Sequence, residues 1–316
     1  FVELMLVSII LMILIVITVK WGLLGLNGVL LSSCIAVAMC LVVMLLGINI
    51  KSYISIKYFS IQTLKELITY SWPLVPNSLS LWVMNLSDRL IISFFLGVEA
   101  NAIYAVANKI PQLFTVVQGT VISAWQENAS VYSKDDDVEL YYSKMFNSIL
   151  GITAGIMSGL IVITPIIFKL LIRGDYKEAY YQMPLLFLAM FFSSISSFVG
   201  GIYVAHKHTK SVGVTTIVAA IINFIINLFF IKKIGIYAAS LSTLISYFFL
   251  ACYRIIDVQK FQIIRIINRK NILIMFGLTI ICAIFYINTL CSNTVNFIFG
   301  VSFAIFVNKD IIKIFF

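Results

Sequence analysis

Long apolar runs separated by short polar segments fill most of the 316-residue chain. A hydrocarbon core about 30 Å thick requires roughly 20 apolar residues for each transmembrane helix. Irregular backbone cannot be exposed to lipid because nothing there can hydrogen-bond it, so each run must be helical. We therefore predict an all-α polytopic membrane protein with about ten transmembrane helices. The predicted spans are 1–19, 23–48, 70–96, 102–125, 145–172, 181–204, 210–231, 235–253, 272–290 and 294–308.

The composition excludes several other classes of protein. Apolar residues make up 61% of the chain and charged residues 11%, against about 45–50% and about 25% in soluble domains. A soluble enzyme, a disordered chain and a nucleic-acid-binding domain are excluded on this ground. The five cysteines show no CxxC spacing and the two histidines share one short loop, so neither a metal site nor a disulfide framework is predicted.

The positive charges predict how the chain is oriented. Fourteen of the 22 Lys and Arg residues fall on one side of the predicted spans, six fall on the other, and Arg89 and Lys109 fall inside spans. Short loops rich in Lys and Arg face the cytoplasm. Both ends of this chain are therefore predicted to be cytoplasmic. The cation-rich segments are 49–69, 126–144, 205–210, 254–271 and the tail after 308.

The span at 70–96 carries polar residues on one side of its helix. Counted at 100° per residue from Asn77, the side chains of Asn85, Asp88 and Arg89 fall in one sector. A charge at mid-bilayer costs about 3 kcal/mol on insertion scales, so Asp88 and Arg89 cannot face lipid. Two interpretations remain open: the pair satisfies one another or a neighbouring helix, or it lines a cavity as an anion site with a titratable partner.

Two further spans carry polar stripes. In 102–125, Asn108 and Gln112 lie on one face, with Lys109 at its edge. Such a face can form hydrogen bonds between helices, or it can line a site that contacts sugar. The positive charge of Lys109 favours a contact with phosphate. In 210–231, Asn223 and Asn227 are accompanied by no charge, so helix packing is the simpler interpretation.

Four passages, in this order and spacing, resemble the polysaccharide-transporter branch of the multidrug/oligosaccharidyl-lipid/polysaccharide (MOP) exporter superfamily, the Wzx-like O-antigen flippases. The resemblance covers residues 70–253. The passages are Tyr70–Asn77 running into Ser87–Ile92, Ala102–Pro111, Asn223–Ile231 and Gly235–Thr243.

The resemblance implies two six-helix lobes followed by a terminal helix pair, a MOP/MATE-like bundle. The family's first four helices would be absent from this chain, which begins inside an apolar run. The segment 49–69 is predicted to be an amphipathic linker on the cytoplasmic surface. The implied divisions are 1–48 (last two helices of the N-terminal lobe), 49–69 (linker), 70–253 (C-terminal lobe), 254–271 (cytoplasmic basic loop) and 272–316 (terminal pair).

With this resemblance, the expected function is translocation of an undecaprenyl-diphosphate-linked oligosaccharide, an O-antigen or capsule repeat unit, across the bacterial inner membrane by alternating access. Arg89 and Lys109 are candidates for contacts with phosphate or acidic sugars, and Asp88 for ion coupling, with both H+ and Na+ open as the ion. No catalytic residue, metal site or other cofactor is expected. The candidate sugar-contacting amides are Asn77, Asn85, Asn108 and Gln112.

Two alternatives differ from this hypothesis in testable ways. An ion-coupled multidrug antiporter of the same superfamily would favour an acidic, aromatic cavity, which the two cations argue against. A membrane polymerase or ligase of lipid-linked sugars would need a large outward loop, whereas the longest outward connection is near 173–180. We therefore expect no enzyme activity. The expected partners are a polyprenyl-diphosphate-linked glycan, membrane lipids and the polymerase and chain-length proteins of the pathway, with no nucleic acid.

Overall fold

The computed structural model describes residues 9–11, 13, 15, 17, 25–47, 59–265 and 268–315. All regular structure in these residues is helical, which confirms the predicted all-α class. The chain forms two compact units, 1–66 and 67–316, whose boundary falls inside α4 (Ile61–Ser71). Most of the predicted span 1–19 and the first ten residues of the predicted linker, 49–58, lie outside the described residues.

The first unit contains α2 (Gly25–Gly47), which corresponds to the predicted span 23–48. Leu30 and Val37 are among its exposed apolar side chains. The Ser32 hydroxyl donates to the Gly28 carbonyl oxygen one turn earlier at 2.7 Å, which satisfies the hydroxyl within the helix. A helix that is apolar on most sides is suited to lipid.

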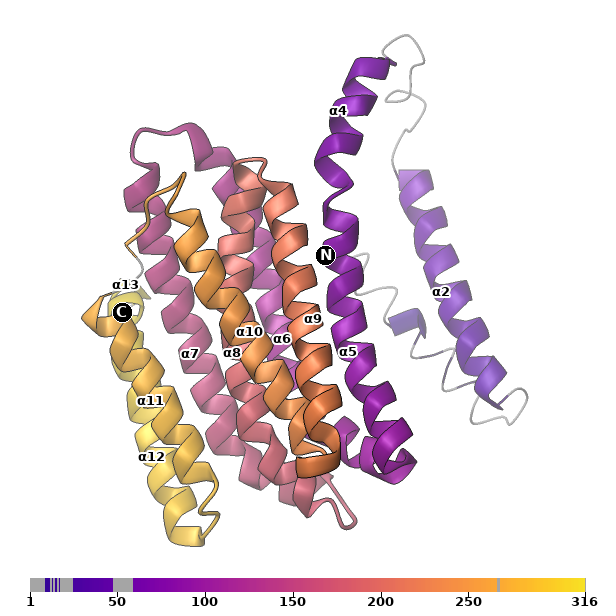
Figure 1. Ribbon diagram of the computed structural model, residues 1–316, viewed down its shortest axis with the longest axis vertical. Helices are drawn as coiled ribbons and strands as arrows, with labels where there is room; N and C mark the ends of the chain where they lie inside the picture. Colours follow the sequence, from indigo (N-terminus) through magenta and orange to yellow (C-terminus); the bar gives the residue numbers. More distant parts are fainter. Residues whose placement is uncertain are drawn as a thin grey trace. The chain divides into compact units, whose positions relative to one another are not determined.

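The second unit is a bundle of long helices (Figure 1). It begins with the end of α4, where proline at position 73 interrupts the helix and a turn at Trp72 and Pro73 leads into the next helix. The helices that follow are α5 (Leu74–Leu96), α6 (Val98–Val131), α7 (Val138–Leu171), α8 (Lys177–Ala205), α9 (Thr209–Ile234), α10 (Tyr237–Val258), α11 (Arg269–Phe285), α12 (Leu290–Val307) and α13 (Lys309–Phe315), with a short 3-10 turn, η2 (Tyr132–Lys134), between α6 and α7.

Six helical segments in the described part of the chain are long and apolar enough to cross a membrane. Three other predicted spans are helical without meeting that measure. In α2 the described apolar segment is the shorter Leu30–Met39, α6 carries polar and charged side chains along its length, and α11 has 17 residues. The chain is thus a multi-pass membrane protein. The six segments are Ile61–Leu96, Val138–Leu171, Lys177–Ala205, Thr209–Ile234, Tyr237–Val258 and Leu290–Val307.

Helix α8 is the central helix of the second unit, packing against α6 and α10, while α5 and α10 both pack against α9. Its side chains are mostly buried, including Phe187, Phe191 and Phe198. The hairpin of α11 and α12 packs against α7 at one edge of this unit (Figure 1). Helix α5 lies against α6, α9 and α10, which all contact it.

Several helix ends differ from the predicted span ends. Helix α6 continues to Val131 and α7 begins at Val138, so most of the predicted loop 126–144 is helical. Helix α10 continues to Val258, which shortens the predicted loop 254–271 and places Arg254 within the helix. Hydropathy locates the apolar part of a helix, but a helix can continue past the hydrocarbon into water.

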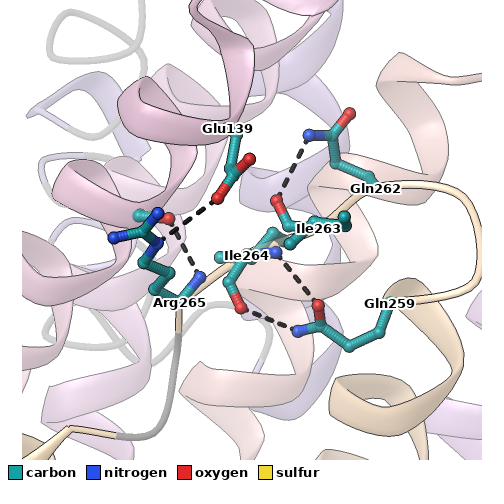
Figure 2. A network of polar contacts seen from close by, with 7 residues as sticks. Glu139, Gln259, Gln262, Ile263, Ile264 and Arg265 are labelled. Carbon is teal, nitrogen blue, oxygen red and sulfur yellow. Dashed lines mark hydrogen bonds and ion pairs between the residues drawn. The ribbon is translucent and has the colours of Figure 1, made fainter.

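The shortened loop after α10 is held by its own polar contacts (Figure 2). The Gln259 amide donates to the Ile264 carbonyl oxygen at 2.8 Å, and the Ile264 backbone N–H donates back to Gln259 at 3.0 Å. Arg265 then forms an ion pair with Glu139 of α7, with Nε and Oε1 3.4 Å apart. This exposed pair contributes little stability by itself, but it places the loop beside the start of α7.

Candidate functional site

Asp88 of α5 lies at the junction of four helices. Its side chain is 3% exposed. The Asn227 amide on α9 donates to Oδ1 at 2.7 Å, while the Thr243 hydroxyl on α10 and the Tyr104 hydroxyl on α6 donate to Oδ2 at 2.8 and 3.1 Å. Three hydrogen bonds to a carboxylate stabilise its charged form at a buried position.

Further polar groups surround this carboxylate. The Asn223 amide donates to Ser242 at 3.2 Å and to Thr243 at 3.3 Å, and its own oxygen lies 3.5 Å from the Ser87 hydroxyl. The side-chain oxygen of Asn227 is buried without a hydrogen-bond partner in the described part of the chain. We name Asp88, Asn223, Asn227 and Thr243 the Asp88 cluster. Its carboxylate, amide and hydroxyl oxygens are ligands that hard cations prefer, and the carboxylate can also bind a proton.

Asp88 and Arg89 are not paired with one another. Asp88 is buried against neighbouring helices, whereas Arg89 is exposed on the surface of the second unit. Consecutive helical residues point about 100° apart, which explains how one turns inward and the other outward. Interhelical hydrogen bonds thus satisfy Asp88, whereas an anion site at Arg89 stays a prediction.

The other predicted site residues also divide into two groups. Asn85, Lys109 and Gln112 are exposed, like Arg89. Asn108 is 8% exposed and donates to the Tyr104 carbonyl oxygen of its own helix at 2.9 Å. Within the described residues, no hydrogen bond or ion pair joins Arg89 to Lys109.

Asn77 takes part in a contact between helices. Its side-chain oxygen accepts a hydrogen bond of 2.6 Å from the Thr216 hydroxyl of α9. Asn77 and Asn108 are thus engaged within the second unit, and the accessible members of the predicted set are Asn85, Arg89, Lys109 and Gln112 on α5 and α6. These four side chains combine two cations with two amides, a set suited to phosphate and sugar hydroxyls.

Arg254 is the charged residue whose environment the sequence did not predict. Its side chain is 4% exposed inside α10, although it directly follows the predicted span 235–253 and belongs to the predicted basic loop 254–271. Its guanidinium donates to Thr215, Thr216 and two backbone carbonyl groups. The sequence feature that could have indicated this burial is the pair Thr215 and Thr216 in the predicted span 210–231. Their hydroxyl groups supply hydrogen-bond acceptors near the end of α10.

Comparisons with known proteins agree with this architecture. Residues 1–181, more than half of the chain, match the sequence profile of a family described as "polysaccharide biosynthesis protein". No protein of established function matches the chain in sequence. A solved structure described as "Lipid II flippase MurJ, inward closed conformation" is similar, with a TM-score of 0.65 and 18% sequence identity over 97% of this chain and 67% of that one.

At that identity the likeness to the flippase structure shows a common fold, whereas the family profile is matched by sequence. Both agree with the MOP-exporter resemblance carried by residues 70–253. The chain belongs to the polysaccharide biosynthesis protein family.

Proposed function

We propose that the protein moves a polyprenyl-diphosphate-linked glycan, an O-antigen or capsule repeat unit, from the cytoplasmic to the periplasmic leaflet of the bacterial inner membrane. The observation that carries this proposal is the accessible set of Arg89, Lys109, Asn85 and Gln112 on α5 and α6. The family match supports a role in polysaccharide synthesis, and the similar fold is that of a protein described as a lipid II flippase.

The chemistry of such a substrate explains why a protein is required. A diphosphate and many sugar hydroxyls cannot enter hydrocarbon unaided, whereas the polyprenyl chain is apolar and remains in the hydrocarbon. Exposed guanidinium and ammonium groups would bind the phosphates, and amides would bind hydroxyl groups. A site of this kind near mid-membrane would then open alternately to either side. The Lys and Arg distribution supports a cytoplasmic location for both ends of this chain.

The Asp88 cluster is our candidate for ion coupling. It offers one carboxylate, the unpartnered oxygen of Asn227 and the hydroxyl of Thr243 from three different helices. Binding of Na+ or a proton there would change the charge that holds α5, α9 and α10 together. Among the described residues no hydrogen bond or ion pair joins the cluster to the four accessible residues. Its effect on them would be transmitted through α5, which carries Asp88, and through α6, whose Tyr104 donates to Asp88.

The function is tested in a strain that lacks the chromosomal gene. We expect that strain to lose the surface glycan and to accumulate lipid-linked repeat units on the inner leaflet. Wild-type protein should restore export, whereas Arg89→Ala should not, at equal protein level. Arg265→Ala is the matched control, because Arg265 is exposed but lies in the loop after α10. Normal surface glycan in the Arg89→Ala strain would contradict the proposed site.

A further inference from the structure

Three helices of the second unit each carry two polar residues that are eleven positions apart. Eleven residues correspond to about three helical turns and about 16 Å, so both members of a pair lie on the same face of their helix. One member of each pair contacts the Asp88 carboxylate or is Asp88 itself, and the other belongs to a second polar layer. The pairs are Asp88 and Asn77 on α5, Asn227 and Thr216 on α9, and Thr243 and Arg254 on α10.

Arg254 connects three helices within that second layer. Its Nη1 donates to the Ser196 carbonyl oxygen of α8 at 2.9 Å. Its Nε donates to the Thr215 hydroxyl at 3.1 Å, and its Nη2 donates to the Val212 carbonyl oxygen at 3.1 Å and to the Thr216 hydroxyl at 2.8 Å, all on α9. Four donors in a rigid plane fix both the distance and the rotation of α10 relative to its neighbours.

The layer extends to α5 through one hydroxyl group. Thr216 accepts from Arg254, and its own hydrogen faces two acceptors, the Asn77 oxygen at 2.6 Å and the Val212 carbonyl oxygen at 2.9 Å. One turn earlier on both helices, Gly213 lies so close to Pro73 that a Cβ atom added at this glycine would collide with the Pro73 carbonyl oxygen. Helices α5 and α9 are thus in direct backbone contact where the layer joins them.

The acceptors of Arg254 are all uncharged. In the described part of the chain, the ion pairs that form are those of Lys260 with Asp257 and of Arg265 with Glu139. Asp257, one turn beyond Arg254, instead accepts from Tyr203 and Lys260, both at 2.8 Å. A buried charge without a counter-charge is costly, and a packed apolar side chain would avoid that cost. The hydrogen bonds of the guanidinium instead fix the positions of α8, α9 and α10 relative to one another.

We propose that Arg254 is a positioning residue for the Asp88 cluster. By fixing α9 and α10 against α8 and, through Thr216, against α5, it aligns Asn227 and Thr243 with the carboxylate three turns away. The expected effect on export rests on the proposed function. The alignment of the Asp88 cluster can be measured without an export assay.

The test uses the full chain with its native cysteines replaced and with Ser87→Cys as a reporter. Ser87 is 8% exposed, lies beside Asp88 and does not contact Arg254. In the Arg254→Gln variant we expect maleimide labelling at position 87 to become about ten-fold faster, because the cluster opens more often. Arg254→Lys should be intermediate, since an ammonium group keeps the charge but loses the planar fork.

Lys260→Gln is the matched control. It removes one positive charge near the same end of α10 from a side chain that is 72% exposed, and labelling should not change. Unchanged labelling in Arg254→Gln would overturn the proposal. Gly200→Ala gives a second route if Arg254→Gln does not fold: a Cβ atom there would lie 3.1 Å from Nη1, which displaces the guanidinium without removing it. Faster labelling is expected, and an unchanged rate would again overturn the proposal.

Export measured in parallel separates the two proposals. If the wild-type protein moves no lipid-linked glycan, the proposed function fails, while the labelling rates still test the role of Arg254. If Arg254→Gln loses export with unchanged labelling at position 87, the function stands and the positioning role is wrong.

Discussion

Asn227 and Asp88 are joined by a hydrogen bond of 2.7 Å that connects α9 to α5, and the same asparagine has a buried oxygen without a partner among the described residues. The Asn227 amide donates to the Asp88 carboxylate through its nitrogen, so its unpartnered oxygen can accept a bond from a positive ligand. A proton or Na+ at this position would complete the oxygen's bonding and offset the negative charge. This relationship is the observation from which we propose ion coupling at Asp88.

Asp88→Asn should lower glycan export by about ten-fold or more, because it removes the charge that a coupling ion needs at a functional site inside the membrane. The variant keeps the size of the side chain, so protein level in the membrane should be nearly normal. Glu99→Gln is the matched control: Glu99 is exposed at the start of α6, and the same change of charge there should leave export intact. Full export by Asp88→Asn would remove the ion-coupling role.

Asn227→Ala should lower the free energy of unfolding by about 1–3 kcal/mol, because it leaves a buried carboxylate without one of its three donors. Thermal unfolding of the detergent-purified protein measures this effect. Asn85→Ala is the control, since Asn85 is exposed and its amide donates to the Leu81 carbonyl oxygen of its own helix. Equal stability of the two variants would show that the Asp88 cluster does not support the fold.

Lys109→Gln should lower export while changing the free energy of unfolding by less than about 0.5 kcal/mol, as expected for an exposed position. Lys109→Arg keeps the charge and should retain most of the export. Surface glycan and thermal stability are measured on the same preparations. Loss of export in both variants would indicate that the charge is not what Lys109 contributes.

Gly213→Ala should destabilise the protein by about 1–3 kcal/mol, because the added methyl group forces α9 away from the Pro73 carbonyl group at a packed contact. Gly119→Ala provides the comparison on another helix, since nothing lies within 4 Å of a Cβ atom added there. That substitution should be neutral or slightly stabilising, because alanine favours a helix over glycine. A stable Gly213→Ala variant would show that α5 and α9 do not require this close approach.

The sequence predicted the helices well because each apolar run must become a helix in lipid. Helix ends were less predictable: α6 runs on to Val131 because a helix that leaves the hydrocarbon need not stop. Within the site, periodicity placed Asp88 and Arg89 in one polar sector, but it could not say which of the two faces a neighbouring helix. That depends on α6, α9 and α10, which supply Tyr104, Asn227 and Thr243 from far along the chain.

Arg254 illustrates the same limit. A cation at the end of an apolar run is normally assigned to the membrane surface, and hydropathy does not detect acceptors on other helices. The guanidinium can be buried because Thr215, Thr216 and the Ser196 carbonyl group accept its hydrogen bonds and because Gly200 leaves room for it. Such an environment becomes visible only once α8, α9 and α10 are packed together.

The most direct test of the account is lipid translocation by the purified full-length protein in liposomes. A polyprenyl-diphosphate-linked glycan is placed in both leaflets, and its arrival at the outer surface is followed by an added glycosidase. We predict that wild-type protein exposes the inner pool with time and that Arg89→Ala slows this to the rate of empty liposomes. An inner pool that stays protected with wild-type protein in the presence of both Na+ and proton gradients would contradict the account.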